Sequence, residues 1–250
     1  MKKLAWFQIV NALLVVATIV INILANALPL NGLNTGEISD RFDVLFVPAG
    51  YVFSIWGLIY IGLIAFAIFQ ALPSQRDNRR IEAITPAFIA ASLGNIVWLF
   101  LWHYEKFTLT IFAMLVLLVS LIAIYQTLRM GKKPSKAEWW CLFLPFSIYL
   151  GWVSVATIAN ATQWLYFLNW NGFGISGTIW AVILLVVGTF LAAVMRLQKN
   201  DIAYGLVLVW AFVGIGIAQA ATPLVVNAAY LFAVIILLIL ILPYLFVKKS

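Results

Sequence analysis

Few side chains in this sequence are suited to acid–base, nucleophilic or metal chemistry. The 250 residues include one histidine, His103, one cysteine, Cys141, and eight acidic residues. His103 and Glu105 offer two metal ligands, fewer than a zinc site uses, and a single cysteine allows no intrachain disulfide. The sequence holds no Ser-His-Asp spacing, glycine-rich phosphate loop or metalloprotease motif. We therefore predict no catalytic residues, no metal site and no required cofactor, and we expect His103 to be a polar tip at the membrane interface.

Aromatic residues are the more informative set, with 11 tryptophans, 9 tyrosines and 18 phenylalanines. Several tryptophans lie near the ends of apolar stretches, where indole rings usually anchor helices at the interface. Others lie farther inside and form pairs one helical turn apart: Trp56 with Tyr60, Asn95 with Trp98, and Tyr149 with Trp152. Aromatic walls with a few amide groups are typical of small-molecule sites. Core packing and an amide hydrogen bond between helices are the alternative interpretation.

These residues must be positioned by helices that cross a membrane. The sequence is 65% hydrophobic and 9% charged, whereas a soluble domain is about half apolar and about a quarter charged. A helix needs about 20 apolar residues to cross the hydrocarbon core. We therefore predict an all-α, integral multi-pass membrane bundle with eight spans, at about 5–27, 49–72, 83–103, 107–128, 138–159, 175–195, 202–221 and 223–246.

The positive charges predict which side of the membrane each loop occupies. Lysine and arginine accumulate in short cytoplasmic loops, and all of them except Arg41 and Lys106 fall on alternate connections that share one side. This pattern predicts both termini in the cytoplasm, and it favours membrane loops over a nucleic-acid-binding surface despite the net charge of +7. A cleaved N-terminal signal sequence, which would leave seven spans, is the alternative.

This topology brings the three pairs to a similar depth. Trp56, Asn95 and Trp152 each lie about eight residues from the outer end of a span, or about 12 Å at the helical rise of 1.5 Å. We therefore predict a small-molecule site in the outer half of the bundle, lined by Trp56, Tyr60, Asn95, Trp98, Tyr149 and Trp152. The loop 29–48 is the longest predicted connection on that side, and loops of this length often act as lids or binding elements.

Three segments in the first five spans carry recognisable motifs. Residues 48–60 read PAGYVFSIWGLIY, residues 95–98 read NIVW, and Pro145, Phe146, Trp152, Ala156 and Asn160 are spaced along the fifth span. In this order they resemble the TspO/MBR family, the tryptophan-rich sensory proteins related to the translocator protein. The corresponding patterns of that family read approximately P-P-G-W-V-F-x-x-V-W-x-x-L-Y, N-x-x-W and P-Y-x-x-W-x-x-x-A-x-x-x-N. The resemblance covers about residues 5–165.

The resemblance implies a five-helix bundle whose pocket opens under the first long loop and binds tetrapyrroles such as protoporphyrin, sterols or other hydrophobic ligands. The chain departs from the family pattern at Ala49, where a second proline is expected, at Tyr51, where tryptophan is expected, and in three extra residues between Pro145 and Trp152. Three further spans have no counterpart in a five-helix family. We therefore expect a TspO-like bundle at 1–170 and three additional helices packed on it at 171–250.

Residues and resemblance together predict a non-enzymatic sensor or carrier for a hydrophobic small molecule, with a tetrapyrrole or lipid as its bound ligand. A facilitative transporter of neutral metabolites or lipids is the alternative, and a pigment-degrading membrane enzyme is the third hypothesis. A proton-driven pump is disfavoured because no acidic residue lies at mid-depth in a span. Expected partners are membrane lipid and the ligand, without nucleic acid. Gly214 and Gly216 allow close packing within the bundle or in a homodimer, and we expect a prokaryotic cell membrane as the location.

Overall fold

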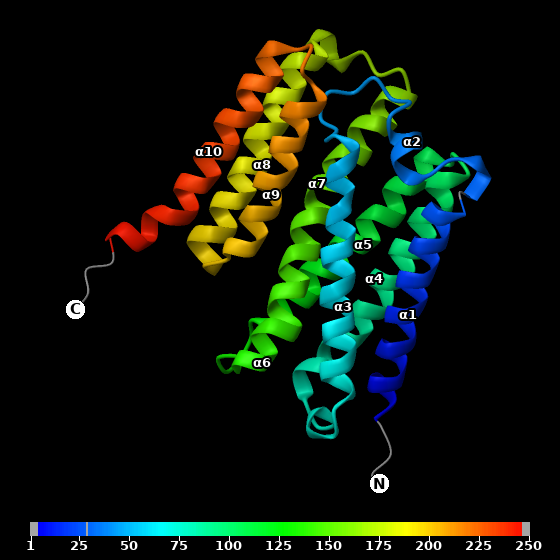
Figure 1. Cartoon of the computed structure of the whole chain (residues 1–250), viewed down its shortest axis with the longest axis vertical. Helices are drawn as coiled ribbons and strands as arrows, with labels where there is room; N and C mark the ends of the chain where they lie inside the picture. Colours follow the sequence, from blue (N-terminus) through cyan, green and yellow to red (C-terminus); the bar gives the residue numbers. More distant parts are fainter. Residues whose placement is uncertain (1–4, 29, 247–250) are drawn as a thin grey trace. The chain divides into compact units, whose positions relative to one another are not determined.

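The computed structural model describes residues 5–28 and 30–246, and throughout that part of the chain it is helical without strands (Figure 1). The helices are α1 Trp6–Ala27, α2 Thr35–Ser39, α3 Ile55–Ala71, α4 Arg79–His103, α5 Phe107–Leu128, α6 Lys136–Glu138, α7 Leu144–Phe167, α8 Gly177–Lys199, α9 Ile202–Ala218 and α10 Pro223–Phe246. Short 3-10 turns occupy Leu30–Gly32, Gly50–Ser54, Pro73–Gln75 and Gly172–Gly174, and a π-helical segment occupies Trp139–Phe143.

The predicted membrane helices are confirmed. Seven helical segments among the described residues are long and apolar enough to cross a membrane, with the turn Gly50–Ser54 continuing into α3 and α6 continuing through the π-helical segment into α7. The remaining helix, α9, is apolar and has 17 residues, or about 26 Å of length, at the short end of the spanning range. It ends at Ala218 instead of residue 221, and α7 continues to Phe167 instead of residue 159. The protein is therefore an integral, multi-pass membrane protein.

The sidedness stays a prediction, and part of its support, at Lys2, Lys3, Lys248 and Lys249, lies outside the described residues. Cysteines placed at Lys133 and Asn169 in a Cys141→Ala background test it. We expect a membrane-impermeant thiol reagent to label position 169 from the outside and position 133 only after the membrane is opened. Labelling of both positions from the same side would contradict the eight-span arrangement.

Several helices start and stop where the sequence places capping residues. The Asn78 side chain accepts hydrogen bonds from the backbone of Arg80 and Ile81 at the start of α4, and Asp201 accepts one from Tyr204 at the start of α9. Asn200 has a φ of 52°, the left-handed conformation that commonly ends a helix, and it ends α8. Pro223 occupies the first position of α10, where its missing N–H leaves no hydrogen bond unmade.

The described chain forms two compact units. The first contains the residues up to Ile38 together with Ile55–Val153, and the second contains Ser39–Ser54 together with the residues from Ser154 onward. The expected division at residue 170 falls inside the second unit. The segment 39–54 groups with the C-terminal helices because it lies directly on α9, where the backbone N–H of Ala49 donates to the carbonyl of Gly214 at 3.1 Å.

The first unit is built around α1, α3, α4, α5 and the first half of α7. Its core contains three phenylalanine rings, Phe66, Phe88 and Phe146, whose centroids are 5.2 to 5.8 Å apart in edge-to-face arrangements. Gly94 lets α4 approach the backbone of α5, since a Cβ added there would lie 3.1 Å from the backbone nitrogen of Leu117. These close contacts fix α3, α4 and α7 relative to one another.

The second unit places α8, α9 and α10 side by side (Figure 1, yellow to red). Small residues again allow close packing: Gly188 lies against the ring of Phe212, and Gly205 lies against the side chain of Leu240. The indole of Trp210 on α9 donates a hydrogen bond to the carbonyl of Val52 at 3.1 Å. The segment that precedes α3 is therefore held on α9 by hydrogen bonds.

Candidate ligand site

Four of the predicted site residues form one aromatic cluster in the first unit, centred on Trp56. Its ring stacks on Tyr60 with centroids 5.7 Å apart and meets the rings of Tyr149 and Trp152 at 5.8 and 6.4 Å in edge-to-face arrangements. Trp56 and Tyr60 lie one turn apart on α3, while Tyr149 and Trp152 lie one turn apart on α7. Tyr149 and Trp152 are each 2% exposed, and Trp56 and Tyr60 are half-buried. We name these four residues the aromatic cluster.

Asn95 on α4 adds a polar group beside this cluster. Its side-chain oxygen accepts a hydrogen bond from the amide nitrogen of Asn22 on α1 at 2.7 Å, and the residue is 1% exposed. The side chains of Asn95 and Tyr149 interact, yet neither the amide nitrogen of Asn95 nor the hydroxyl oxygen of Tyr149 reaches hydrogen-bond geometry with a described atom. An unsatisfied buried polar group costs about 1–3 kcal/mol. A ligand or water that bonds to either atom would recover that free energy.

The sixth predicted residue, Trp98, lies one turn after Asn95 on α4, nearer to the end of that helix. Its ring stacks on Trp102 with centroids 5.5 Å apart and planes at 16°. The Trp102 indole in turn donates a hydrogen bond to the carbonyl of Thr35 in α2 at 3.2 Å. The stack therefore links the outer end of α4 to the loop that follows α1, as expected for a loop that covers a site. Residue 29 of that loop lies outside the described chain.

His103 was expected to be a polar tip at the interface, and this prediction is wrong. The side chain is 1% exposed, and its Nδ1 lies 2.8 Å from the carbonyl oxygen of Leu99. The loop after α1 covers it, because the amide nitrogen of Asn31 donates to the carbonyl of His103 at 3.0 Å. The described residues contain no group of three or more histidine, cysteine or acidic side chains that could hold a metal ion.

One face of α1 is polar and buried, a feature that was not predicted from the sequence. Gln8, Asn11, Thr18 and Asn22 are at most 4% exposed. Gln8 and Gln70 exchange two hydrogen bonds, each amide donating to the other residue's backbone carbonyl, at 2.6 and 2.8 Å. The Asn11 amide donates to the hydroxyl of Thr85 at 3.0 Å. The signal was present in the sequence, since these residues recur at intervals of three, seven and four, the spacing of one helix face.

Comparison with known proteins identifies the family of this chain. A family model described as TSPO-like protein matches residues 8–242. The chain belongs to this TSPO-like family. The match runs from α1 into α10. The family pattern therefore includes the three C-terminal helices, which have no counterpart in a five-helix bundle. No curated protein and no solved structure matches the chain.

Family membership supports the general role expected of the site. The aromatic cluster, Asn95 and the polar face of α1 all lie within the matched residues. A TSPO-like membrane protein is associated with ligand binding or sensing in a general sense. The family match names no ligand.

Proposed function

We propose that the protein is a membrane sensor or carrier that binds a flat, hydrophobic small molecule of tetrapyrrole or sterol type. The site consists of the aromatic cluster and Asn95, with Trp98 on its outer side. The single observation that carries the proposal is a pair of buried polar atoms beside four aromatic rings, the amide nitrogen of Asn95 and the hydroxyl of Tyr149, neither of which makes a hydrogen bond of standard geometry with a described atom. In the family resemblance, Trp56, Asn95, Trp98 and Trp152 match motif positions of the TspO/MBR pattern.

The chemistry of these side chains indicates the class of ligand. Indole and phenol rings offer broad apolar faces that stack on a planar macrocycle or pack against a fused ring system. The Asn95 amide nitrogen carries two N–H donors, and the Tyr149 hydroxyl can both donate and accept a hydrogen bond. A carbonyl, carboxyl or hydroxyl group on the ligand would satisfy them. The ligand is therefore largely apolar and carries at least one oxygen function on one edge.

We propose binding without catalysis and without a resident cofactor. The site residues are aromatic rings, phenols and one amide, a set that contains no histidine, thiol or carboxylate for general acid–base or nucleophilic catalysis. Conversion of a bound tetrapyrrole to a new product by the purified protein, lost on substitution of Trp152, would instead favour the pigment-degrading hypothesis.

Facilitated passage of a small neutral solute is the second candidate, and the polar face of α1 favours it. The side-chain oxygens of Asn11, Thr18 and Gln70 are buried without hydrogen-bond partners among the described residues. Uncharged polar atoms on α1, together with Gln70 on the neighbouring α3, could bond to a polar solute at successive depths. Saturable uptake of a neutral solute into proteoliposomes, reduced by Asn11→Leu, would place transport ahead of sensing.

Tyr149→Phe provides the sharpest test of the proposed site. The Tyr149 hydroxyl interacts with the Asn95 side chain but makes no hydrogen bond of standard geometry with a described atom, so its removal is expected to change the unfolding temperature little. If the hydroxyl bonds to the ligand, protoporphyrin affinity should fall about fivefold to tenfold, equivalent to about 1–1.4 kcal/mol. Tyr104→Phe, at a residue 52% exposed, is the matched control and should change neither property. Wild-type affinity in Tyr149→Phe would remove the hydroxyl from the site.

A further inference from the structure

The second unit contains a cavity of its own, with a volume of about 620 Å³. Pockets that bind small molecules usually have volumes of about 300–1,000 Å³. None of the residues of the aromatic cluster lines this cavity, and neither does Asn95. Its walls come from the segment Asp43–Phe46, the last turns of α7, the connection to α8 and the first turns of α8.

The turn between α7 and α8 builds one wall of the cavity. Asn169, Gly172, Phe173 and Gly174 all have positive φ angles, between 54° and 78°, which makes the connection tight. The indole of Trp180 on α8 donates to the carbonyl of Gly172 at 3.0 Å. Both Trp180 and Trp170 line the cavity, and their ring centroids are 5.3 Å apart. The turn thus fixes two large aromatic rings at the same end of the cavity.

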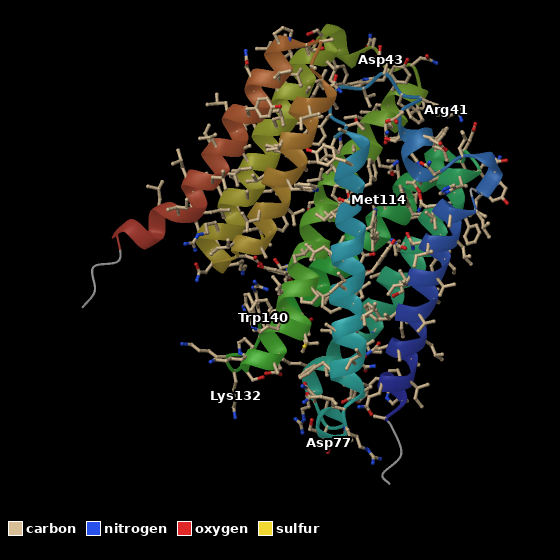
Figure 2. All side chains as sticks on the ribbon, viewed as in Figure 1. Arg41, Asp43, Asp77, Met114, Lys132 and Trp140 are labelled. Carbon is tan, nitrogen blue, oxygen red and sulfur yellow. The ribbon has the colours of Figure 1, made fainter. Side chains whose placement is uncertain are left out.

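The lining becomes mostly apolar along α7 and α8. Asp43 in the segment after α2 (Figure 2) and Asn171 in the turn lie outside the helices. Ile158 is nine positions from the end of α7 and Leu184 is seven from the start of α8, or about 10–14 Å along the helices. The cavity therefore has a polar end at the connecting segments and a mostly apolar end within the spans, where Thr157 and Thr162 are the polar lining residues.

Charge and ring chemistry indicate the head group that fits the polar end. Asp43 is exposed and is the single charged residue among the described residues that line the cavity. A carboxylate attracts a positively charged group and repels an anion. Trp170, Trp180 and Tyr166 also line the cavity, and indole and phenol faces attract ammonium groups.

We propose that this cavity binds one membrane amphiphile, with an ammonium-bearing head beside Asp43 and its tail along α7 and α8. A zwitterionic lipid has this chemistry. The site is separate from the proposed tetrapyrrole site, because the two share no residue. It uses α8, which a five-helix bundle lacks, and so gives the C-terminal helices a binding role.

Binding of two lipids with the same tail tests the proposal. Palmitoyl lysophosphatidylcholine and palmitoyl lysophosphatidylglycerol are titrated onto the purified full-length protein in neutral detergent, and bound lipid is counted by native mass spectrometry. We expect one lysophosphatidylcholine bound at least about tenfold more tightly than its anionic counterpart. Asp43→Asn should remove most of this preference. Equal binding of the two lipids by the wild type would overturn the assignment of an ammonium head.

A filling variant tests the location. Ala161 on α7 lines the cavity, and Ala161→Trp should abolish lipid binding, whereas Ala123→Trp at an exposed position of α5 should not. Protoporphyrin affinity should stay at the wild-type value in Ala161→Trp, which separates this site from the proposed function. A lysophosphatidylcholine with a photoreactive tail provides a test without substitution: adducts are expected within 157–166 and 177–184. Unchanged lipid binding in a folded Ala161→Trp protein, or adducts confined to other segments, would overturn the proposal.

Discussion

Trp152→Leu is expected to weaken protoporphyrin binding by at least about tenfold, or about 1.4 kcal/mol. The indole of Trp152 meets Trp56 at 6.4 Å and is 2% exposed. Leucine remains apolar but removes the ring face on which a macrocycle would stack. Binding is measured by absorbance titration of the tetrapyrrole, which does not depend on tryptophan fluorescence. Thermal unfolding of the same sample separates loss of binding from loss of fold.

Combining Trp152→Leu with Asn95→Leu shows whether both residues contact one ligand. If they do, the double variant should deviate from the sum of the single variants by about 0.5 kcal/mol or more in binding free energy. Independent packing roles would instead give additive losses of stability without a selective loss of binding. Gln126→Leu, which replaces an exposed amide on α5, is the control for Asn95→Leu. Equal affinity of the wild type and both single variants would exclude the proposed site.

Gly214→Val is expected to destabilise the second unit by about 2–3 kcal/mol, because a Cβ at this position of α9 would overlap the Cγ2 of Val52 and lie 3.2 Å from the Cβ of Pro48. The segment that carries these residues also bonds to the Gly214 carbonyl, so it cannot move away without losing that hydrogen bond. The unfolding temperature should fall by several degrees.

Gly57→Val is the matched control for this substitution. Gly57 is also helical, and a Cβ added there meets no described atom within 4 Å outside its own stretch of helix. The two variants share the cost of a β-branched residue in a helix, so the difference between their unfolding temperatures measures the close approach at Gly214. Equal unfolding temperatures would mean that the segment 48–52 is not packed on α9 as described.

Helix positions could be predicted from the sequence because each depends on a local property. An apolar run of about 20 residues marks a span wherever it occurs, and α5 and α10 were predicted with their observed bounds, 107–128 and 223–246. The aromatic cluster could also be predicted, since helical rise and alternating topology place Trp56 and Trp152 at one depth. The bounds of α7 were less predictable, because its last turns carry polar residues such as Gln163 that the structure buries.

What the sequence could not provide were contacts between distant segments. Nothing local to His103 indicates that Asn31 covers it, and the loop 29–48 contains no signal that residues 39–54 group with α9. The polar residues of α1 recur at helical spacing in the sequence. Mean hydropathy does not reveal this spacing, because four polar residues only slightly lower the mean of an otherwise apolar span. Their meaning depends on Gln70, Thr85 and Asn95, which lie in other helices.

The hydrogen bonds of α1 also constrain the order of events during synthesis. Gln8, Asn11 and Asn22 bond to residues that follow them by 62, 74 and 73 positions. At about 5–20 residues per second, the ribosome needs roughly 3–15 seconds to supply those partners. Until then the buried amides of α1 have no intrachain partner across the helices, and polar groups facing lipid alone are unfavourable. The first helix therefore gains all of these interhelical hydrogen bonds only after α4 has been synthesised. Its stable integration into the membrane thus depends on the emergence of the third long helix.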